Sequence, residues 1–532
     1  MAMGGKERRT LVLVNLASIM ERADEALLPA VYKEVGAALN TTPTGLGSLT
    51  LFRSIVQASC YPLAAYMAVR HNRAHVIALG AFLWAAATFL VAVSDTFFEV
   101  AIARGLNGVG LALVTPAIQS LVADSTNDST RGSAFGWLQL TGNLGSIIGG
   151  ILTLLLASTS FMGIAGWRIA FHLVAIISVV VGILVRLFAA DPHFPDGVTT
   201  NTELAARKSA LKEVKDLIIE AKAVMKIPSF RIIVAQGVTG TFPWSALSFA
   251  PMWLELMGFS HEGTGFLMSM FAVASSIGGL VGGKMGDSLA KRYPNSGRII
   301  LSQISSASAI PLGAILMLAL PDDPSTAFGH AFVMFIMGLS ISWNAPATNK
   351  IGSHEKFPTP SAIDSSAELS PIFAEIVPEK SRTSIYALDR SFESVLASFA
   401  PPVVGLLAER VYGYKPVPYG KGASTSIETD RENAASLAKA LYTAIAIPMT
   451  LCCLIYSFLY RTYPRDRERA RMDSLIASEM QQIELESSDE VGDYSEIAVS
   501  RKELLGGERS VIDIVYGNED FEADENDEKA LL

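Results

Sequence analysis

Residues 74–94 read AHVIALGAFLWAAATFLVAVS, a run of twenty-one residues that contains no Asp, Glu, Lys or Arg. About 20 consecutive apolar residues are enough for an α-helix to cross the hydrocarbon core of a bilayer. Eleven further stretches have a similar length and an apolar character, at residues 10–33, 45–68, 99–122, 132–157, 167–189, 229–256, 264–286, 299–319, 327–349, 384–408 and 436–460. The sequence therefore predicts an all-α membrane protein with twelve transmembrane helices.

The connections between these stretches alternate in charge. The basic connections contain Arg70 and Arg73, Arg131, residues 190–228, Lys284 to Arg298, Lys380 and Arg382, and Arg461 to Arg471, with Lys6, Arg8 and Arg9 before the first stretch. The opposite connections, around Asp95, Ser158, Glu255 and Asp322, carry almost no basic residues. Because cytoplasmic loops carry an excess of Lys and Arg, we predict a multi-pass membrane protein with both termini in the cytoplasm.

The negative net charge comes from the C-terminal tail alone. The formal charge of the chain is −9, and residues 472–532 contain 18 acidic and 4 basic residues, which gives −14 for that segment and about +5 for the rest. We therefore predict an acidic, disordered cytoplasmic tail over residues 463–532. Neither part has a basic surface typical of nucleic-acid binding, so nucleic acid is not expected as a partner.

The twelve stretches divide six and six around a polar segment. We predict an N-terminal six-helix bundle over residues 1–190, a cytoplasmic amphipathic linker over 191–228 and a C-terminal six-helix bundle over 229–462. Two repeated halves that are joined by a cytoplasmic linker are typical of secondary transporters.

A repeated spacing relates the two halves. A set of residues that begins at Gly108 is spaced by 8, 8, 7 and 4 positions, and a corresponding set begins at Gly338. In the second set the interval between Pro346 and Glu375 is 29 positions instead of 8. We therefore predict a 21-residue insertion near residues 350–370, extruded as a cytoplasmic loop. The insertion is either a regulatory loop or an error in the gene model.

Several short motifs lie in or beside the apolar stretches. Residues 62–73 read PLAAYMAVRHNR and resemble the first signature of the major facilitator superfamily as found in spinster-like lipid transporters, with Ala65 replacing Gly and Val69 replacing an acidic residue. Residues 104–110, RGLNGVG, resemble the fourth-span motif, followed by Leu111 where the spinster-like branch usually has Glu. WRIAF at 167–171 resembles a further motif of the superfamily, and MER at 20–22 resembles part of the first span of the spinster-like branch.

The resemblance covers residues 8 to 462. The sequence is most similar to the plant form of the spinster-like branch. It implies the major facilitator fold, with two pseudo-symmetric six-helix bundles, and alternating-access transport. It also implies lysophospholipid- or sphingolipid-like substrates and protons as the coupling ion. Membrane lipids are then the surrounding partners of the chain.

Charged residues within the apolar stretches are the candidate site. A charge at the centre of a bilayer costs roughly 2.5–3.5 kcal/mol even on lenient scales, so a functional reason is expected. We predict that Glu21 senses the proton, and that Arg22 and Arg104 engage either Glu21 or an anionic group of the substrate. The full set predicted for proton coupling or substrate binding is Glu21, Arg22, Asp24, Glu25, Arg53 and Arg104. The alternative is a static ion-pair network that joins the first, second and fourth stretches.

A second charged set lies near the cytoplasmic boundary. The repeated first signature contains Asp287, Lys291 and Arg292, and the resemblance implies that these residues latch the two halves together in one state. The complete predicted cytoplasmic gate is Arg70, Arg73, Asp287, Lys291, Arg292, Arg382, Asp389 and Arg390.

No catalytic signature, phosphate-binding loop or metal-type histidine spacing is recognisable in the sequence. The three cysteines, Cys60, Cys452 and Cys453, all lie in apolar stretches. We therefore expect no enzyme activity, no cofactor and no metal.

Two other functions are also compatible with the sequence. The chain could transport a small polar or anionic solute, or it could be a non-transporting receptor or scaffold that signals through its tail. A lateral opening lined by apolar residues would favour the lipid substrate over the polar solute.

Short targeting motifs lie in the predicted tail and in one loop. YSEI at 494–497 fits a tyrosine-based sorting signal, and the end of the chain, from Asp527 to Leu532, fits an acidic dileucine signal. Asn40 begins a glycosylation sequon in the first non-cytoplasmic loop. Together these motifs predict sorting adaptors as partners, and a location in the plasma membrane or in an endomembrane of the vacuolar or lysosomal type.

Overall fold

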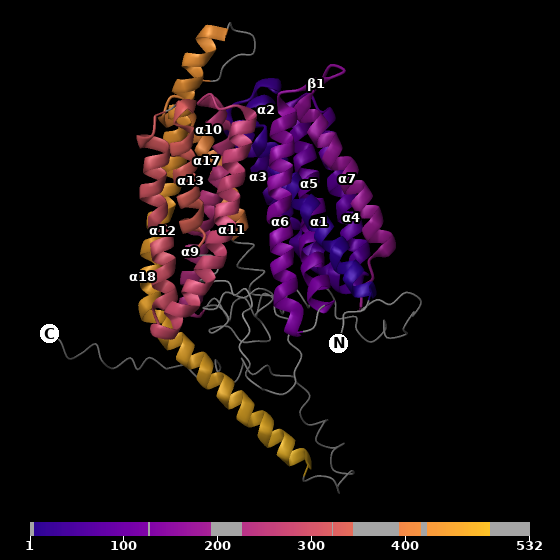
Figure 1. Cartoon of the computed structure of the whole chain (residues 1–532). Helices are drawn as coiled ribbons and strands as arrows, with labels where there is room; N and C mark the ends of the chain where they lie inside the picture. The colour runs from indigo at the N-terminus through magenta and orange to yellow at the C-terminus, as the bar shows by residue number, and fades with distance from the viewer. Residues whose placement is uncertain are drawn as a thin grey trace, which may run out of the picture.

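The computed structural model describes residues 5–125, 128–192, 226–321, 323–343, 393–415 and 423–489, and nearly all of them are helical (Figure 1). The first half contains α1 (Gly5–Ala30), α2 (Tyr32–Ala38), α3 (Pro43–Arg70), α4 (Arg73–Val93), α5 (Phe97–Asp124), α6 (Asp128–Ala157), the short hairpin β1 (Ser160–Phe161) and β2 (Ile164–Ala165), and α7 (Gly166–Phe188). The second half contains α9 (Pro228–Ala246), η2 (Leu247–Phe249), α10 (Ala250–Leu256), α11 (His261–Arg292), α12 (Gly297–Ala314), η3 (Ile315–Ala319), η4 (Pro324–Thr326), α13 (Ala327–Ile341), α17 (Ala400–Leu406), η6 (Leu407–Val411) and α18 (Ala423–Asp489). The predicted all-α membrane fold is confirmed.

The number of membrane crossings is only partly established. Nine helical segments of the described residues are long and apolar enough to cross a membrane. The predicted stretches 10–33, 45–68 and 229–256 are also helical but are not among these nine. The first of them is α1, whose centre carries four charged residues, and such charges lower the hydropathy of a helix. The total of twelve crossings therefore stays a prediction.

The predicted seventh stretch is not one continuous helix. Pro243 lies inside α9, and the chain changes to the 3-10 helix η2 at Leu247 before α10 begins. Proline has no backbone N–H, so Pro251 cannot donate the bond that would continue an α-helix to the carbonyl of Leu247. Pro251, rather than Pro243, therefore accounts for the position of the break.

The last helix extends into the segment that we predicted to be disordered. α18 continues from the twelfth stretch to Asp489 and protrudes beyond the other helices (Figure 1). Residues 465–486 are rich in Arg, Glu, Met, Leu and Ala, which favour helix, and the preceding span provides a formed helix to extend. Residues 193–225 of the predicted linker, the block at 350–370 and the tail beyond 489 lie outside the described residues.

Two glycines of the fourth-span motif allow α5 to approach its neighbours closely. A Cβ atom on Gly108 would come closer than 3.0 Å to the backbone of Arg53 in α3, and one on Gly110 would do the same at Trp84 in α4. Small residues at a helix interface let the backbones approach closely, and membrane helices pack in this way because no hydrophobic driving force acts between them. The motif therefore packs α5 against α3 and α4 at the centre of the first half.

Replacing Gly110 with valine should destabilise the first half. The new side chain would collide with the backbone of α4, and overpacking of this kind costs about 1–3 kcal/mol. We expect a lower melting temperature for purified Gly110→Val in detergent. Gly105→Val is the matched control, because the nearest atom to a Cβ there is a methyl carbon of Val56 at 3.7 Å. Equal melting temperatures for the two variants would contradict this account of the motif.

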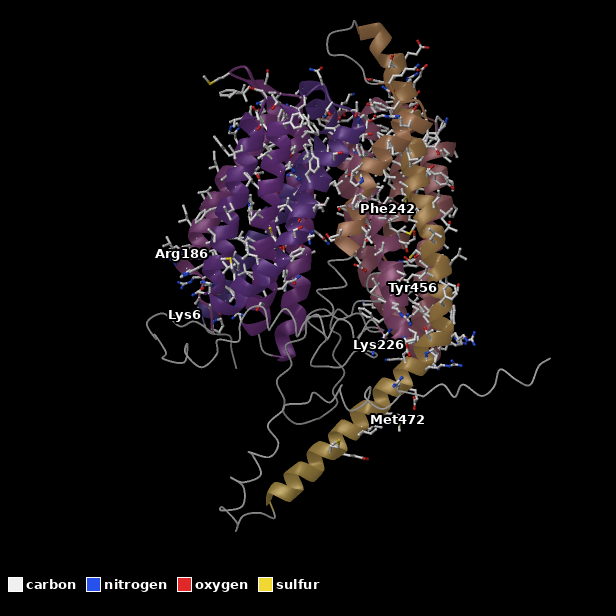
Figure 2. The ribbon with its side chains drawn as sticks, turned by 180° about the vertical axis from the view of Figure 1, so that it is seen from behind. Lys6, Arg186, Lys226, Phe242, Tyr456 and Met472 are labelled. Atoms are coloured by element: carbon white, nitrogen blue, oxygen red, sulfur yellow. The ribbon has the colours of Figure 1, made fainter. Side chains whose placement is uncertain are left out.

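The two halves meet mainly along two helix pairs. α3 packs against α17, and α6 packs against α11. Lys6, Arg186 and Lys226 lie toward one end of the molecule, which we call the basic end (Figure 2). α2 and α10 lie at the other end, which we call the outer end (Figure 1). From the charge of the loops we predict that the basic end faces the cytoplasm.

Candidate functional site

The centre of α1 directs its charged residues into two different environments. Glu25 is a member of an ion-pair network: it accepts a hydrogen bond from Arg22 at 3.0 Å and one from Arg53 of α3 at 2.9 Å. The side chain of Arg53 is only 12% exposed, whereas that of Arg22 is 46% exposed. Both oxygens of Glu25 are therefore paired with a cation, and only Arg22 has a substantial free surface.

Asp24 is buried between α1, α4 and α5. One carboxylate oxygen accepts a hydrogen bond from the hydroxyl of Thr88, and the other accepts one from the amide of Asn107 at 2.8 Å. Arg104 is 1% exposed and lies close enough to Asp24 for the two charges to attract each other. Asp24 and Arg104 thus form a closed polar core of the first half that solvent does not reach.

Glu21 has no cationic partner at contact distance among the described residues. The side chain of Glu21 is buried, with a residue exposure of 4%, and its carboxylate accepts a hydrogen bond of 2.5 Å from the hydroxyl of Thr115 in α5. The two described arginines that attract Glu21 from a longer distance, Arg22 and Arg53, make their ion pairs with Glu25 instead. Among the acids of this cluster, Glu25 is therefore paired with cations, whereas Glu21 and Asp24 accept their hydrogen bonds from neutral groups.

The structure thus brings together all six residues that were predicted for coupling or substrate binding. It adds three neutral partners that the sequence analysis missed, namely Thr88, Asn107 and Thr115. A signal for them was present, because each is a polar residue within an otherwise apolar stretch. Their partners, however, lie on other helices, and the sequence alone does not identify them.

The predicted gate residue Arg73 is held within the first half. Its guanidinium forms a buried ion pair with Asp191, at 2.5 and 2.9 Å, and donates a bond of 2.8 Å to the hydroxyl of Ser120. The neighbouring Asn72 of the same motif caps α4 by accepting a bond from the backbone N–H of Ala74 at 3.0 Å. This part of the first signature therefore ties α4 to α5 and to the end of α7.

The other predicted gate residues are described only in part. Lys291 and Arg292 are exposed in the last turn of α11, and the guanidinium of Arg292 lies 5.9 Å from the ring centre of Tyr293. Arg70 ends α3, and Asp287 lies one turn before Lys291. Arg382, Asp389 and Arg390 lie outside the described residues.

At the outer end the two halves are in direct contact. The backbone N–H of Thr44 in α3 donates a bond of 2.7 Å to Glu409 in η6. A Cβ atom on Gly47 would come closer than 3.0 Å to the backbone of Pro401 in α17. Tyr32 contacts the ring of Phe249 across the same boundary between the halves, which we call the seam, with 4.8 Å between the ring centres. These contacts close the space between the halves at this end.

A cluster of two carboxylates and one imidazole also spans this seam. His261, the first residue of α11, lies 2.7 Å from Glu255 of α10 and 3.8 Å from Glu34 of α2. Burial, and next the negative charge of Glu255, raise the pKa of Glu34 to about 7. The three residues belong to the types that hold metal ions. No motif could have predicted the cluster, because its members lie on three separate helices.

A shallow groove lies beside this cluster between α6 and α11. Its volume is about 250 Å³, and its lining is mainly apolar. The lining residues are Ile151, Leu155, His261, Glu262, Gly265, Phe266 and Ser269. The groove follows the seam between the two halves and places His261 at its wall.

The chain is similar to known transport proteins. A family model described as Major Facilitator Superfamily matches residues 14–356. Multidrug resistance protein 1 of Bacillus subtilis is 25% identical over 206 residues, which cover 38% of this chain and 50% of that protein. Protein spinster of Drosophila melanogaster is 22% identical over 339 residues, which cover 63% of this chain and 54% of that protein. A sphingosine-1-phosphate transporter of Mus musculus is 23% identical over 212 residues, which cover 39% of this chain and 37% of that protein.

The matches span roughly half of these relatives or less, so their activities are not carried over directly.

Among solved structures, a bacterial homologue of the human lysosomal transporter Spinster, in an inward-facing and unoccupied conformation, superposes with a TM-score of 0.69. The identity is 16%, and the match covers 87% of this chain and 99% of that chain. This similarity establishes the fold.

Proposed function

Because this chain belongs to the Major Facilitator Superfamily, we propose that it carries lysophospholipid- or sphingolipid-like amphiphiles across a membrane by alternating access, driven by protons. The chain is an integral multi-pass membrane protein with the fold and family of transporters, and it resembles the spinster-like branch. The substrate class and the coupling ion are the parts that we propose.

The observation that carries the proton coupling is the environment of Glu21. A carboxylate at the centre of a bilayer is expensive to keep charged unless a cation or several donors stabilise it. Within the described part of the chain, Glu25 pairs with two arginines, whereas the only side-chain hydrogen bond to Glu21 comes from the hydroxyl of Thr115. Asp24 also accepts bonds from neutral groups, but it is fully buried and Arg104 attracts its charge. We therefore assign to Glu21 the uptake and release of a proton during the transport cycle, while Glu25 keeps its charge.

Two features support an amphiphilic substrate. The groove between α6 and α11 offers a mainly apolar surface at the seam between the halves, where a lipid chain could enter laterally. Arg22 is a half-exposed cation in the middle of a predicted span, so it can receive an anionic headgroup. Arg104 is buried behind Asp24, and we therefore assign the headgroup to Arg22 alone.

Alternating access would use the two halves as rocking bodies, over residues 1–190 and 229–462, with 191–228 as the linker. The contacts at the outer end are those expected of an inward-facing state. At the basic end, Asp287 with Lys291 and Arg292 would latch the halves in the opposite state. We place both termini in the cytoplasm and the protein in the plasma membrane or an endomembrane.

The test is uptake by proteoliposomes that contain the full chain, with and without an inwardly directed proton gradient. Labelled anionic and zwitterionic lysolipids, a polar solute and a cationic drug are compared, and protein-free vesicles are the control. We expect gradient-stimulated uptake of the lysolipids, with Arg22→Gln reducing uptake of the anionic lysolipid more than that of the zwitterionic one. Uptake of the polar solute or the drug alone would contradict the proposed substrate, and no uptake of any compound would favour the scaffold function.

A further inference from the structure

The cluster of Glu34, Glu255 and His261 at the outer end is not used by the proposed transport mechanism. It combines one side chain from the first half, on α2, with two from the second half, on α10 and α11. One potential ligand atom from each residue lies within 4.8 Å of the other two. Nδ1 of His261 is 2.7 Å from Glu255, and its Nε2 is 3.8 Å from Glu34.

The carboxylates of this cluster are incompletely satisfied. The side chain of Glu255 is 3% exposed and that of Glu34 is 18% exposed. In each of them the oxygen Oε2 is buried without a hydrogen-bond partner. A buried carboxylate oxygen that lacks a donor is costly, and each such group in a folded protein calls for an explanation such as an ion.

The nearest lysine does not supply the missing partner. The ammonium of Lys33 donates to the backbone carbonyl of Glu255 at 3.4 Å and lies 3.7 Å from the carboxylate of Asp430 in α18. Its ammonium group therefore pairs with Asp430 and acts on the carboxylates of the cluster only from a longer distance. The cluster itself contains two acids and a single imidazole.

We propose that Glu34, Glu255 and His261 bind a divalent cation of the zinc class, which bridges the two halves at the outer end. Zinc takes nitrogen and carboxylate oxygen ligands at about 2.0–2.2 Å, so ligands around one ion lie roughly 3–4 Å apart. One nitrogen of His261 and one oxygen of each glutamate lie within 4.8 Å of one another, so small side-chain movements would bring these three atoms to this geometry. The imidazole disfavours Ca²⁺ and Mg²⁺, which prefer oxygen ligands alone.

The site exists only while the outer end is closed, because Glu34 and the other two ligands belong to different halves. A cation bound there stabilises the conformation described here, and closure of the outer end in turn strengthens binding of the cation. Zinc on the outer side would therefore slow transport by holding the halves together. The side chain of His261 is 27% exposed and lines the groove beside α6, which gives the ion a route to the site.

The first experiment measures binding of zinc chloride to the purified full chain by calorimetry, in the absence of any substrate. We expect one site in the wild type and an affinity that falls at least about tenfold in His261→Gln and in Glu34→Gln, because loss of a group that only supports a metal ligand already costs about tenfold or more. Glu262→Gln is the matched control, because Glu262 is the exposed acid next to His261 and does not belong to the cluster. Its affinity should equal that of the wild type.

A second measurement, of the melting temperature, distinguishes loss of zinc binding from poor folding of a variant. Zinc should raise the melting temperature of the wild type and of Glu262→Gln, but not that of His261→Gln or Glu34→Gln. The melting temperatures of these last two variants without zinc show whether they are folded. Absence of zinc binding by the wild type, or equal binding by His261→Gln, would overturn the proposal. Since no substrate is present, these outcomes are independent of whether the proposed lipid transport is correct.

Discussion

Replacing Gly47 with leucine should reduce transport about 100-fold by preventing the outer end from closing. Gly47 of α3 faces the backbone of α17, and a Cβ atom there would come closer than 3.0 Å to both Pro401 and Pro402. Backbone atoms cannot move aside as a flexible side chain does, so the clash acts on the whole contact between the halves. If it costs about 3 kcal/mol, the closed population falls by about 100-fold.

The expected signature is a shift of conformation rather than unfolding. Phe249 is buried at the seam in the closed state, where its ring contacts Tyr32. A cysteine in its place (Phe249→Cys) should be labelled faster by a membrane-impermeant thiol reagent when Gly47→Leu is also present. The melting temperature should remain near that of the wild type, because Gly47 packs between the halves and not inside one of them.

The matched control is Gly150→Leu. No atom lies within 4 Å of a Cβ at Gly150 in α6, so the larger side chain should be accommodated and uptake should stay within about twofold of wild type. Full uptake by Gly47→Leu, or slower labelling of Phe249→Cys in its presence, would show that the close approach of α3 and α17 is not required for the transport cycle.

Replacing Glu21 with glutamine should abolish the stimulation of uptake by a proton gradient. The amide keeps the size of the side chain and can still accept the bond from Thr115, but it cannot take up and release a proton at physiological pH. We expect substrate exchange without a gradient to continue, because the site keeps its shape. The measurement is the ratio of uptake with the gradient to uptake without it, which should fall to about one.

Glu25→Gln provides the contrast within the same cluster. Glu25 pairs with Arg22 and Arg53, and removal of one partner of a buried ion pair costs about 3–5 kcal/mol, less where the pair is partly exposed. This variant should lose thermal stability, while its folded fraction keeps the response to the gradient. If Glu25→Gln were stable and uncoupled while Glu21→Gln responded normally, the assignment of the proton to Glu21 would be wrong.

The sequence analysis and the structure differ most where side chains from distant helices meet. The charged centre of α1 was evident from four charged residues within an apolar stretch, because the cost of charge in a bilayer marks such residues. Their pairing was not evident: it required the positions of Thr115, Asn107 and Arg53 on two other helices. Arg73 shows the same limit, since its partner Asp191 follows α7.

The sequence by itself determined the membrane class, the positions of the apolar helices, the family motifs and the residues whose charge needs an explanation. These are local properties, which follow from the thickness of the bilayer and from the residues within one stretch of chain. Only the tertiary structure decided that Glu25 is in ion-pair contact with two arginines and that Glu21, among the described residues, is in contact with none. It also decided that the halves close at the outer end and that Glu34 meets His261 and Glu255. Such contacts depend on how separate helices pack, and residues far apart in the sequence carry no local signal of that packing.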